Sequence, residues 1–246
     1  MSPLTKLTLT EVRLFFREPL GVFFALAFPP ILLVILGSVP AFREPNKDLG
    51  GARVIELYAP IVIALSIATL AFSALPQILA SYREKGILRR MATTPVRPVV
   101  VLAAQLLMCL ALSVVAVLVV LAVGRIAFDV PLPRQAAGYI VAYLLCVLTA
   151  LTIGLLVAAL APSGKGAGSI GTILFFPMLF FAGLWFPRAS MPEALRRVSD
   201  FTPLGAGVQS LQDTASGHWP QLLHIAVMVV WTVAAGAIAA RNFRWE

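Results

Sequence analysis

Long apolar runs alternate with short polar segments along the chain. Crossing a bilayer as a helix takes about 20 mostly apolar residues, and six runs approach or exceed that length. They cover residues 20–39, 57–80, 99–124, 137–161, 169–186 and 221–240. The pattern predicts an all-α integral membrane protein, with six transmembrane helices in a single domain over residues 1–246. Pro29 and Pro30, within the first run, predict a kink there.

Residues 1–19 precede the first run and are amphipathic. With helical spacing, Lys6, Arg13 and Arg17 fall on one side and apolar residues spread over the other. This pattern is typical of a helix that lies in the membrane interface. The apolar run that follows is too long for the hydrophobic region of a cleaved signal peptide.

Two carboxylates, Glu11 and Glu18, fall on the apolar side of that amphipathic segment. Removing a carboxylate from water is costly unless it is paired. We therefore expect one of them to meet a basic residue, near Arg89 or Arg90. The alternative is an interfacial helix with solvated ends.

Residues 81–98 form a polar insert between the second and third runs. They hold one acid, Glu84, and five of the nineteen Lys and Arg residues: Arg83, Lys85, Arg89, Arg90 and Arg97. A charge at the centre of a membrane helix costs about 2.5–3.5 kcal/mol, so the insert must be hydrated. Ser81 and Glu84 match the S-x-x-E capping box of a helix start. Thr94-Pro95 indicates the end of a helix, because the residue before a proline avoids the α-helical conformation. Together they predict a short helix over residues 82–91.

The composition supports a membrane location. Of all residues, 60% are hydrophobic and 12% are charged, against about 25% charged in soluble domains, and the mean hydropathy is +0.93. The formal net charge of +8 is better explained by the positive-inside rule than by nucleic-acid binding. Placing both termini and residues 81–98 in the cytoplasm puts more Lys and Arg inside than outside, so we expect an N-in, C-in topology.

Residues 187–220 form the longest polar stretch. A proline-initiated turn after Pro192 and a weakly apolar run over residues 204–211 are separated by Thr202-Pro203. We expect a helix–turn–helix that re-enters the outer side of the membrane, since non-spanning backbone is tolerated at that depth when protein buries it. A solvated loop is the alternative.

The sequence carries no recognisable catalytic or metal-binding pattern. Cys109 and Cys146 lie within spans and are expected to act as small apolar residues, and His218 and His224 lack partners at metal-ligand spacing. The run GKGAGS at residues 164–169 lacks the spacing and the preceding strand of a phosphate loop. Its glycines instead indicate a tight turn and close helix approach. The absence of acids within the predicted spans argues against a self-contained ion-coupled transporter.

One face of the second predicted span carries four hydrogen-bonding side chains: Ser66, Thr69, Ser73 and Gln77. Such a stripe is poorly placed against lipid, so we expect it to line a substrate pathway. The fifth span offers an opposite wall at Thr172, Phe176, Leu179 and Gly183. Two copies of the chain could enclose a cavity with few polar anchors between these faces, as small-molecule sites do. The alternative is that the hydroxyls only bond helix to helix.

The polar insert resembles, in its setting and in its sequence REKGILRRMATTPVRP, the permease subunit of type-2 ABC transporters. That family's pattern is an acid and a glycine, a hydrophobic-Arg core, then a Thr-Pro and a base. The matching residues are Glu84, Gly86, Leu88, Arg89, Arg90, Thr94, Pro95 and Arg97. Thr202-Pro203 resembles the family's outer re-entrant segment, and the final FRWE resembles the drug-export branch. The resemblance covers essentially the whole chain, with Ile87 standing where Thr is common.

The resemblance implies six membrane helices per chain, paired with a second and usually identical permease. Two separate ATPase subunits would bind ATP and Mg²⁺, so this chain would hold no cofactor and no metal and would catalyse nothing by itself. The helix at 82–91 would be the coupling helix that receives their motion. The residues expected to meet the ATPase are Arg83, Glu84, Lys85, Gly86, Leu88, Arg89, Arg90, Thr94, Pro95, Arg97 and Glu11. Drug and antibiotic exporters of the cell membrane look closest, with export of polysaccharide or lipid-linked glycan as the runner-up.

Physical reasoning alone leaves other interpretations open. Six spans with basic inner loops also suit a membrane-embedded enzyme or a scaffold protein. The insert could equally bind anionic lipid, worth about 1 kcal/mol per Lys or Arg. An enzyme would need convergent His, Asp, Cys or Ser groups, which are missing, and a scaffold would not need the polar residues of the second span.

Overall fold

The structure is a computed structural model that describes residues 3–46, 51–87, 90 and 98–242. The described residues form helices and contain no strand of a sheet. This confirms the predicted all-α class.

Six helical segments of the described chain are long and apolar enough to cross a membrane, as the sequence predicted. The first span comprises α2 (Pro19–Val22), the π-helical η1 (Phe23–Ala27) and α3 (Phe28–Gly37). The second comprises α4 (Val54–Ala68), the π-helical η4 (Thr69–Ala74) and α5 (Leu75–Glu84). The others are α7 (Pro98–Phe128), α8 (Ala136–Leu160), α9 (Gly164–Ala182) and α12 (Leu222–Asn242).

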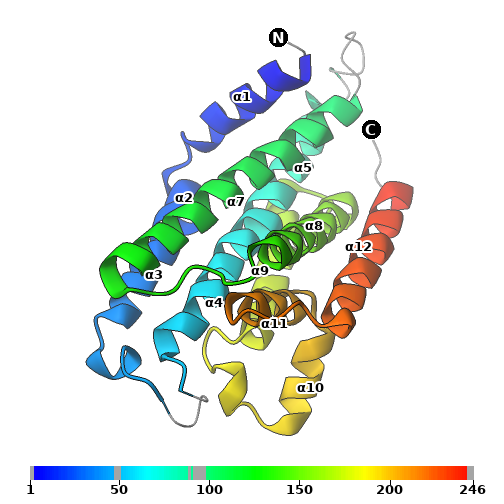
Figure 1. Ribbon diagram of the computed structural model, residues 1–246. Coiled ribbons are helices and arrows are strands. Elements are labelled where there is room, and N and C mark those ends of the chain that lie inside the picture. The colour runs from blue at the N-terminus through cyan, green and yellow to red at the C-terminus, as the bar shows by residue number, and fades with distance from the viewer. Residues whose placement is uncertain (1–2, 47–50, 88–89, 91–97, 243–246) are drawn as a thin grey trace.

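Shorter helices accompany the spans. They are α1 (Pro3–Phe15), the 3₁₀ turns η2 (Pro40–Phe42) and η5 (Arg188–Ser190), α10 (Glu193–Phe201) and α11 (Pro203–Ala215). Helix α1 packs along α7, at the end of the molecule where α5 and α12 finish (Figure 1). Helices α10 and α11 lie toward the opposite end of the bundle (Figure 1).

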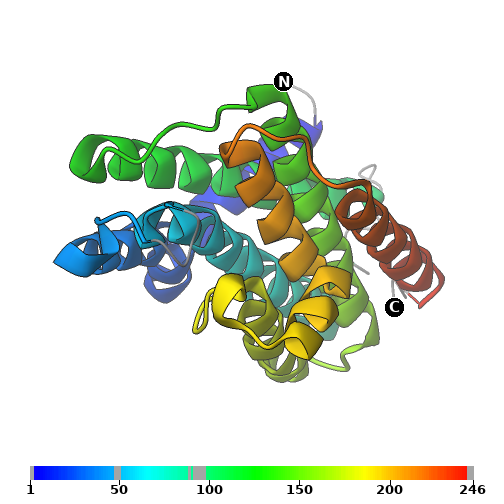
Figure 2. The ribbon, with the colours of Figure 1, turned by 60° about the horizontal axis from the view of Figure 1, so that its bottom comes forward.

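The stretch expected to be a helix–turn–helix forms α10 and α11. Thr202 caps α11, because its Oγ1 accepts a hydrogen bond from the amide of Gly205 at 3.2 Å. Helix α11 is mostly buried and packs against α4, α8, α9 and α12 (Figure 2). Its burial in protein meets the condition under which a short helix can lie at membrane depth, and the re-entry itself stays a prediction.

The second span is the centre of the bundle. Of the residues in its most apolar stretch, 83% are buried inside the chain, against 22% in α9 and 28% in the first and last spans. It packs against α7 on one side and against α8 and α9 on another (Figures 1 and 2). The less buried spans form the outer surface, where apolar side chains suit lipid or a partner chain.

Each of the first two spans contains a π-helical turn just before a proline. Segment η1 precedes Pro29, and η4 precedes Pro76. A proline lacks an amide hydrogen and its ring clashes with the carbonyl four residues earlier, so the wider π-turn accommodates it. Where the sequence predicted a kink at Pro29 and Pro30, the helix has such a turn.

Two glycines let α8 and α9 approach η4 closely. A Cβ added to Gly154 would lie 2.1 Å from the carbonyl oxygen of Ala71, and one added to Gly171 would lie 1.9 Å from that of Phe72. Both distances are far below van der Waals contact, so only glycine fits. Small residues serve this purpose widely where membrane helices touch.

Helix α9 begins and ends earlier than predicted. Residues 164–168, expected to form a turn, are its first residues, and the Oγ of Ser163 caps it by accepting from the amide of Gly166 at 3.1 Å. The helix ends before Gly183, whose φ of +93° is the left-handed conformation that glycine adopts at helix C-termini. The glycines near Ser163 predict a turn, yet they form the start of the helix because the serine cap offsets their low helix propensity.

Candidate functional site

The charged end of α5 holds the turn that joins α8 to α9. The guanidinium of Arg83 donates hydrogen bonds to the carbonyls of Ala159, at 3.3 Å, and of Ala161. The carboxylate of Glu84 accepts a hydrogen bond from the amide of Gly164 at 2.9 Å. Helices carry partial negative charge at their carbonyl ends and partial positive charge at their amide ends. Each side chain therefore suits the helix end that it meets, and we name these contacts the α5 clamp.

The capping box predicted at Ser81 and Glu84 is not formed. Ser81 lies inside α5, which continues to Glu84, and Gly86 follows in the left-handed region with φ of +64°. The carboxylate satisfies an amide of another helix instead of one in its own, because the apolar span carries helical structure past Ser81. The expected start of a separate helix at residue 82 is therefore wrong.

The chain turns after Gly86 toward the rest of the insert. Ile87 and Arg90 are helical, and the guanidinium of Arg90 donates to the carbonyl of Lys85 at 3.0 Å. Lys85 is exposed. The other residues expected to meet an ATPase lie outside the described residues: Leu88, Arg89, Thr94, Pro95 and Arg97.

Glu11 joins α1 to the same end of α5. Its side chain is buried, with 6% exposed, and its Oε2 accepts a hydrogen bond from the hydroxyl of Tyr82 at 2.9 Å. Glu11 thus meets the phenol of Tyr82 instead of the predicted basic residue. Tyr82 directly precedes Arg83 of the α5 clamp. Burial raises the pKa of Glu11, and the hydrogen bond from Tyr82 and the nearby amide of Gln105 in α7 partly offset this rise. Glu18 is exposed.

A cavity of about 580 Å³ opens between α1, α2 and the η4–α5 part of the second span. Three members of the predicted polar stripe line it, namely Thr69, Ser73 and Gln77. Its walls also include charged residues of both signs and apolar residues of α1 and α2. The volume falls within the range of sites for small organic molecules.

Ser66, the fourth member of the stripe, does not line this cavity, and the hydroxyl of Thr69 is engaged within its own helix. The hydroxyls of Ser66 and Thr69 are buried and donate to carbonyls of their own helix, those of Val62 at 3.4 Å and Leu65 at 2.9 Å. For these two residues, the bonding within the helix supports the packing alternative. Ser73 and Gln77 have no such bond among the described contacts.

The predicted wall on the fifth span divides between two environments. Thr172 and Phe176 are exposed on α9, whereas Leu179 is fully buried and Gly183 ends the helix. The cavity beside α5 includes none of these four residues. Equal spacing along a helix therefore did not place them on one open face, because α9 packs its Leu179 side against the bundle.

Comparison with known proteins decides the family. A model of the ABC-2 type transporter family matches residues 4–215. The chain belongs to this family. The match confirms the resemblance at the level of the family and, with it, a transport subunit that is not itself catalytic.

Nodulation protein J of Rhizobium leguminosarum bv. viciae is 32% identical to this ABC-2 chain over 95 residues, which are 38% of the chain. The matched part is 37% of the length of nodulation protein J, well short of two thirds. This relative therefore supports the family and carries no conclusion about cargo.

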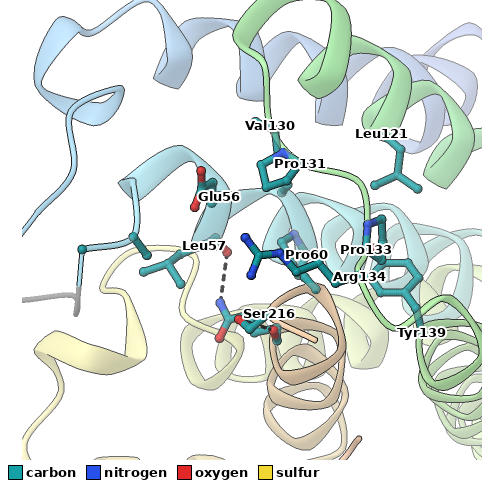
Figure 3. A pocket seen from close by; sticks show the side chains of 15 residues that line it. Glu56, Leu57, Pro60, Leu121, Val130, Pro131, Pro133, Arg134, Tyr139 and Ser216 are labelled. Carbon is teal, nitrogen blue, oxygen red and sulfur yellow. Dashed lines mark hydrogen bonds between the residues drawn. The ribbon is translucent and has the colours of Figure 1, made fainter. Parts of the chain in front are cut away.

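A second pocket of this ABC-2 chain lies toward the end that carries α11 (Figure 3). Its volume is about 330 Å³. The side-chain amide of Gln212 donates to the carbonyl of Leu57 at 3.0 Å on one wall, and the guanidinium of Arg134 points into the pocket toward Glu56 (Figure 3). No sequence pattern predicts this pocket, because its walls come from separate parts of the chain, among them the second span, the α7–α8 connection and α11.

A polar cluster at the same end was also missed. His224, which has no partner at metal-ligand spacing in the sequence, is buried at the start of α12, and its Nε2 lies 3.3 Å from Oδ1 of Asp200. Arg188 pairs with the same carboxylate. Asp213 of α11 is close by, and burial raises its pKa against an opposing effect of His224. The cluster joins α10, α11 and α12, so this part of the ABC-2 chain is tied together by charge as well as packing.

Proposed function

We propose that this chain is the membrane-spanning subunit of an ATP-driven exporter. Separate ATPase subunits, which bind ATP and Mg²⁺, would dock on residues 81–98 from the cytoplasm. The observation that carries this proposal is the α5 clamp. A segment of dense positive charge leads directly into side chains that hold the ends of two other membrane helices.

The clamp provides a path for mechanical coupling. A force applied to the insert would act on the end of α5, and Arg83 and Glu84 would pass it to α8 and α9 through the bonds to Ala161 and Gly164. Tyr82 would pass it to α1 through Glu11. Packed helices move as rigid bodies over small distances, so one docking event would shift several spans together.

The proposed cargo is a small amphipathic molecule, of the drug or antibiotic kind. The cavity beside α5 has the volume of a small-molecule site, about 580 Å³, and combines apolar walls with Ser73 and Gln77. Polysaccharide or lipid-linked glycan remains the second candidate within the family. We place both termini in the cytoplasm and the chain in the cell membrane.

A second copy of the chain would complete the exporter. Helix α9 exposes Ile173 and Phe176, with 71% and 54% of their surfaces free, and this apolar face suits lipid or another protomer. The proposed homodimer would bring the exposed faces of two α9 helices near the pathway.

Co-expression with candidate ATPases, followed by purification through a tag on this chain, tests the proposal. We expect an ATPase to co-purify in a one-to-one ratio and ATP hydrolysis to be lost when its own phosphate loop is mutated. Purification of the chain without an ATPase, and binding of the insert only to anionic vesicles, would instead support the lipid-patch interpretation. Catalytic activity of the chain alone would support an enzyme.

A further inference from the structure

The cavity beside α5 reaches a buried carboxylate that lacks a cationic partner. Glu11 is 6% exposed, and the ion pairs found among the described residues do not include it. Its hydrogen bond comes from the neutral hydroxyl of Tyr82. A carboxylate in such surroundings is stabilised strongly by a positive charge, because the effective dielectric constant is low.

Gln105 of α7 is an unsatisfied polar group next to Glu11. Its side chain is fully buried and lies close enough to influence the pKa of Glu11. Neither its amide nitrogen nor its amide oxygen reaches hydrogen-bond geometry with a described group. Buried polar atoms in native proteins usually have partners, so the surroundings of Glu11 are short of polar contacts. Gln105 does not line the cavity, so Glu11 is the buried carboxylate that a ligand there can reach.

The remaining walls indicate the shape of that ligand. Leu14 and Phe15 of α1 and Leu20 of α2 provide apolar surface. The second span adds the apolar Ile78 and the polar groups of Ser73 and Gln77. A molecule that fits has an apolar body and one polar end. The walls therefore exclude a small hydrophilic ion as the best occupant.

Other charges at the cavity do not reverse the preference for a cation. Arg17, Glu18 and Lys85 also line it, but all three are exposed. Water screens exposed charges, whereas a charge in a buried place acts with little screening. Glu11 is thus the dominant charge for a bound molecule.

We propose that this cavity binds an amphipathic organic cation, with the cationic group against Glu11 and the apolar body against α1 and α2. The inference rests on the proposed function where it takes this molecule to be the cargo. Binding itself needs no ATPase, so it can be tested separately. Glu11 would then select cargo by charge, in addition to joining α1 to α5.

The test measures equilibrium binding to the purified full chain in detergent, without an ATPase. The probes are rhodamine 6G, an amphipathic cation, and sulforhodamine B, a related dye with net negative charge, followed by fluorescence anisotropy. We expect saturable binding of the cation and at least tenfold weaker binding of the anion. Equal binding of both dyes, or no saturable binding of the cation, would overturn the proposal.

Three variants separate charge from structure. Glu11→Gln keeps the size of the side chain and should weaken rhodamine 6G binding at least tenfold. Tyr82→Phe removes the hydrogen bond but keeps the carboxylate, so binding should be retained or tightened. Glu44→Gln, an exposed carboxylate outside the cavity, should bind as the parent does. Equal losses in Glu11→Gln and Tyr82→Phe would show that Glu11 is only structural and would overturn the proposal.

The two proposals fail in different ways. Absence of any ATPase partner, with charge-selective binding intact, would contradict the exporter and leave the cation site standing. An ATPase complex whose permease binds both dyes equally would contradict the cation site and leave the exporter standing. Thermal unfolding of each variant in the same detergent checks that a lost signal reflects binding and not loss of the fold.

Discussion

The carboxylate of Glu84 accepts a hydrogen bond at 2.9 Å from the backbone amide of Gly164, 80 residues further along the chain. Arg83, its neighbour in sequence, bonds the carbonyls at the end of α8. Two adjacent residues of opposite charge thus hold the two helix ends of one turn. The arrangement places the charged insert in direct contact with the fourth and fifth spans.

Replacing Glu84 by alanine should weaken the start of α9. The change removes a charged acceptor from a helix amide, and losses of helix-capping acceptors cost about 1 kcal/mol. We expect a lower midpoint in thermal unfolding of the detergent-solubilised chain. Glu18→Ala is the matched control, since Glu18 is exposed and makes no side-chain cap bond. Equal midpoints for the two variants would contradict the role of the Glu84–Gly164 bond.

A second prediction concerns the glycines of α9 near η4. Gly171→Ala places a Cβ against the backbone oxygen of Phe72, which a side-chain rotation cannot relieve. Overpacking of this kind costs about 1–3 kcal/mol or more. Gly168→Ala, on the same helix, meets no atom closer than 3.8 Å and should be neutral or stabilising, because alanine favours a helix. Detergent unfolding of the two variants provides the comparison, and similar midpoints would refute the close approach.

Stability should depend on pH through Glu11. Its pKa is raised above the ordinary value of 4.5 by burial, so the folded state holds the proton more tightly than the unfolded state. The free energy of unfolding therefore falls as pH rises from about 4.5 through the raised pKa. Glu11→Gln should remove this part of the pH dependence and be more stable than the parent at neutral pH.

Unfolding midpoints of parent and Glu11→Gln across pH 4.5 to about 8 test the sign. Asp213 also has a raised pKa, but it is present in both proteins and cancels in the difference. If the difference between the two midpoints does not change with pH, Glu11 has the same pKa in the folded and unfolded chains, which would contradict this prediction.

Exchanging Ser73 and Gln77 for leucine should change which compounds are exported. Both residues line the cavity beside α5, so added apolar bulk would alter its capacity and its polar wall. Basal ATP hydrolysis by the associated ATPase should be preserved. Ser38→Leu, at an exposed position at the end of the first span and outside the cavity, serves as a comparison for general effects of an added leucine. Transport assays with several labelled compounds would show either a changed spectrum or, if the stripe is only packing, an unchanged one.

The fold could be predicted largely from hydropathy, because each span is long, apolar and bounded by charge. The ends of the spans were harder to predict. The serine cap at Ser163 and the continuation of α5 to Glu84 depend on competition between local signals. No helix begins at the capping-box pattern of Ser81 and Glu84, because α5 continues through it. Sequence spacing identified the polar stripe but could not tell that Ser66 bonds within its own helix while Ser73 faces a cavity.

Side-chain contacts between residues distant in the sequence also could not be predicted. Glu11 was expected to meet a basic residue, since a charge is the commonest remedy for a buried acid, and it meets Tyr82 instead. His224 showed no partner at ligand spacing, yet Asp200 reaches it from another helix. The first pair is set by the placement of α1 beside α5 and the second by the packing of α10 on α12. A single sequence holds no periodic signal for either arrangement.

Substrate-stimulated ATP hydrolysis by the complex of this chain with its ATPase tests the coupling role of the insert most directly. The double variant Glu84→Ala, Arg89→Ala removes one acid and one base from residues 81–98. The matched control Glu193→Ala, Arg197→Ala removes an exposed acid–base pair on α10, at the opposite end. We expect the first variant to insert and to assemble but to lose stimulation, and the control to keep it. Full stimulation in Glu84→Ala, Arg89→Ala would contradict docking and coupling through the insert.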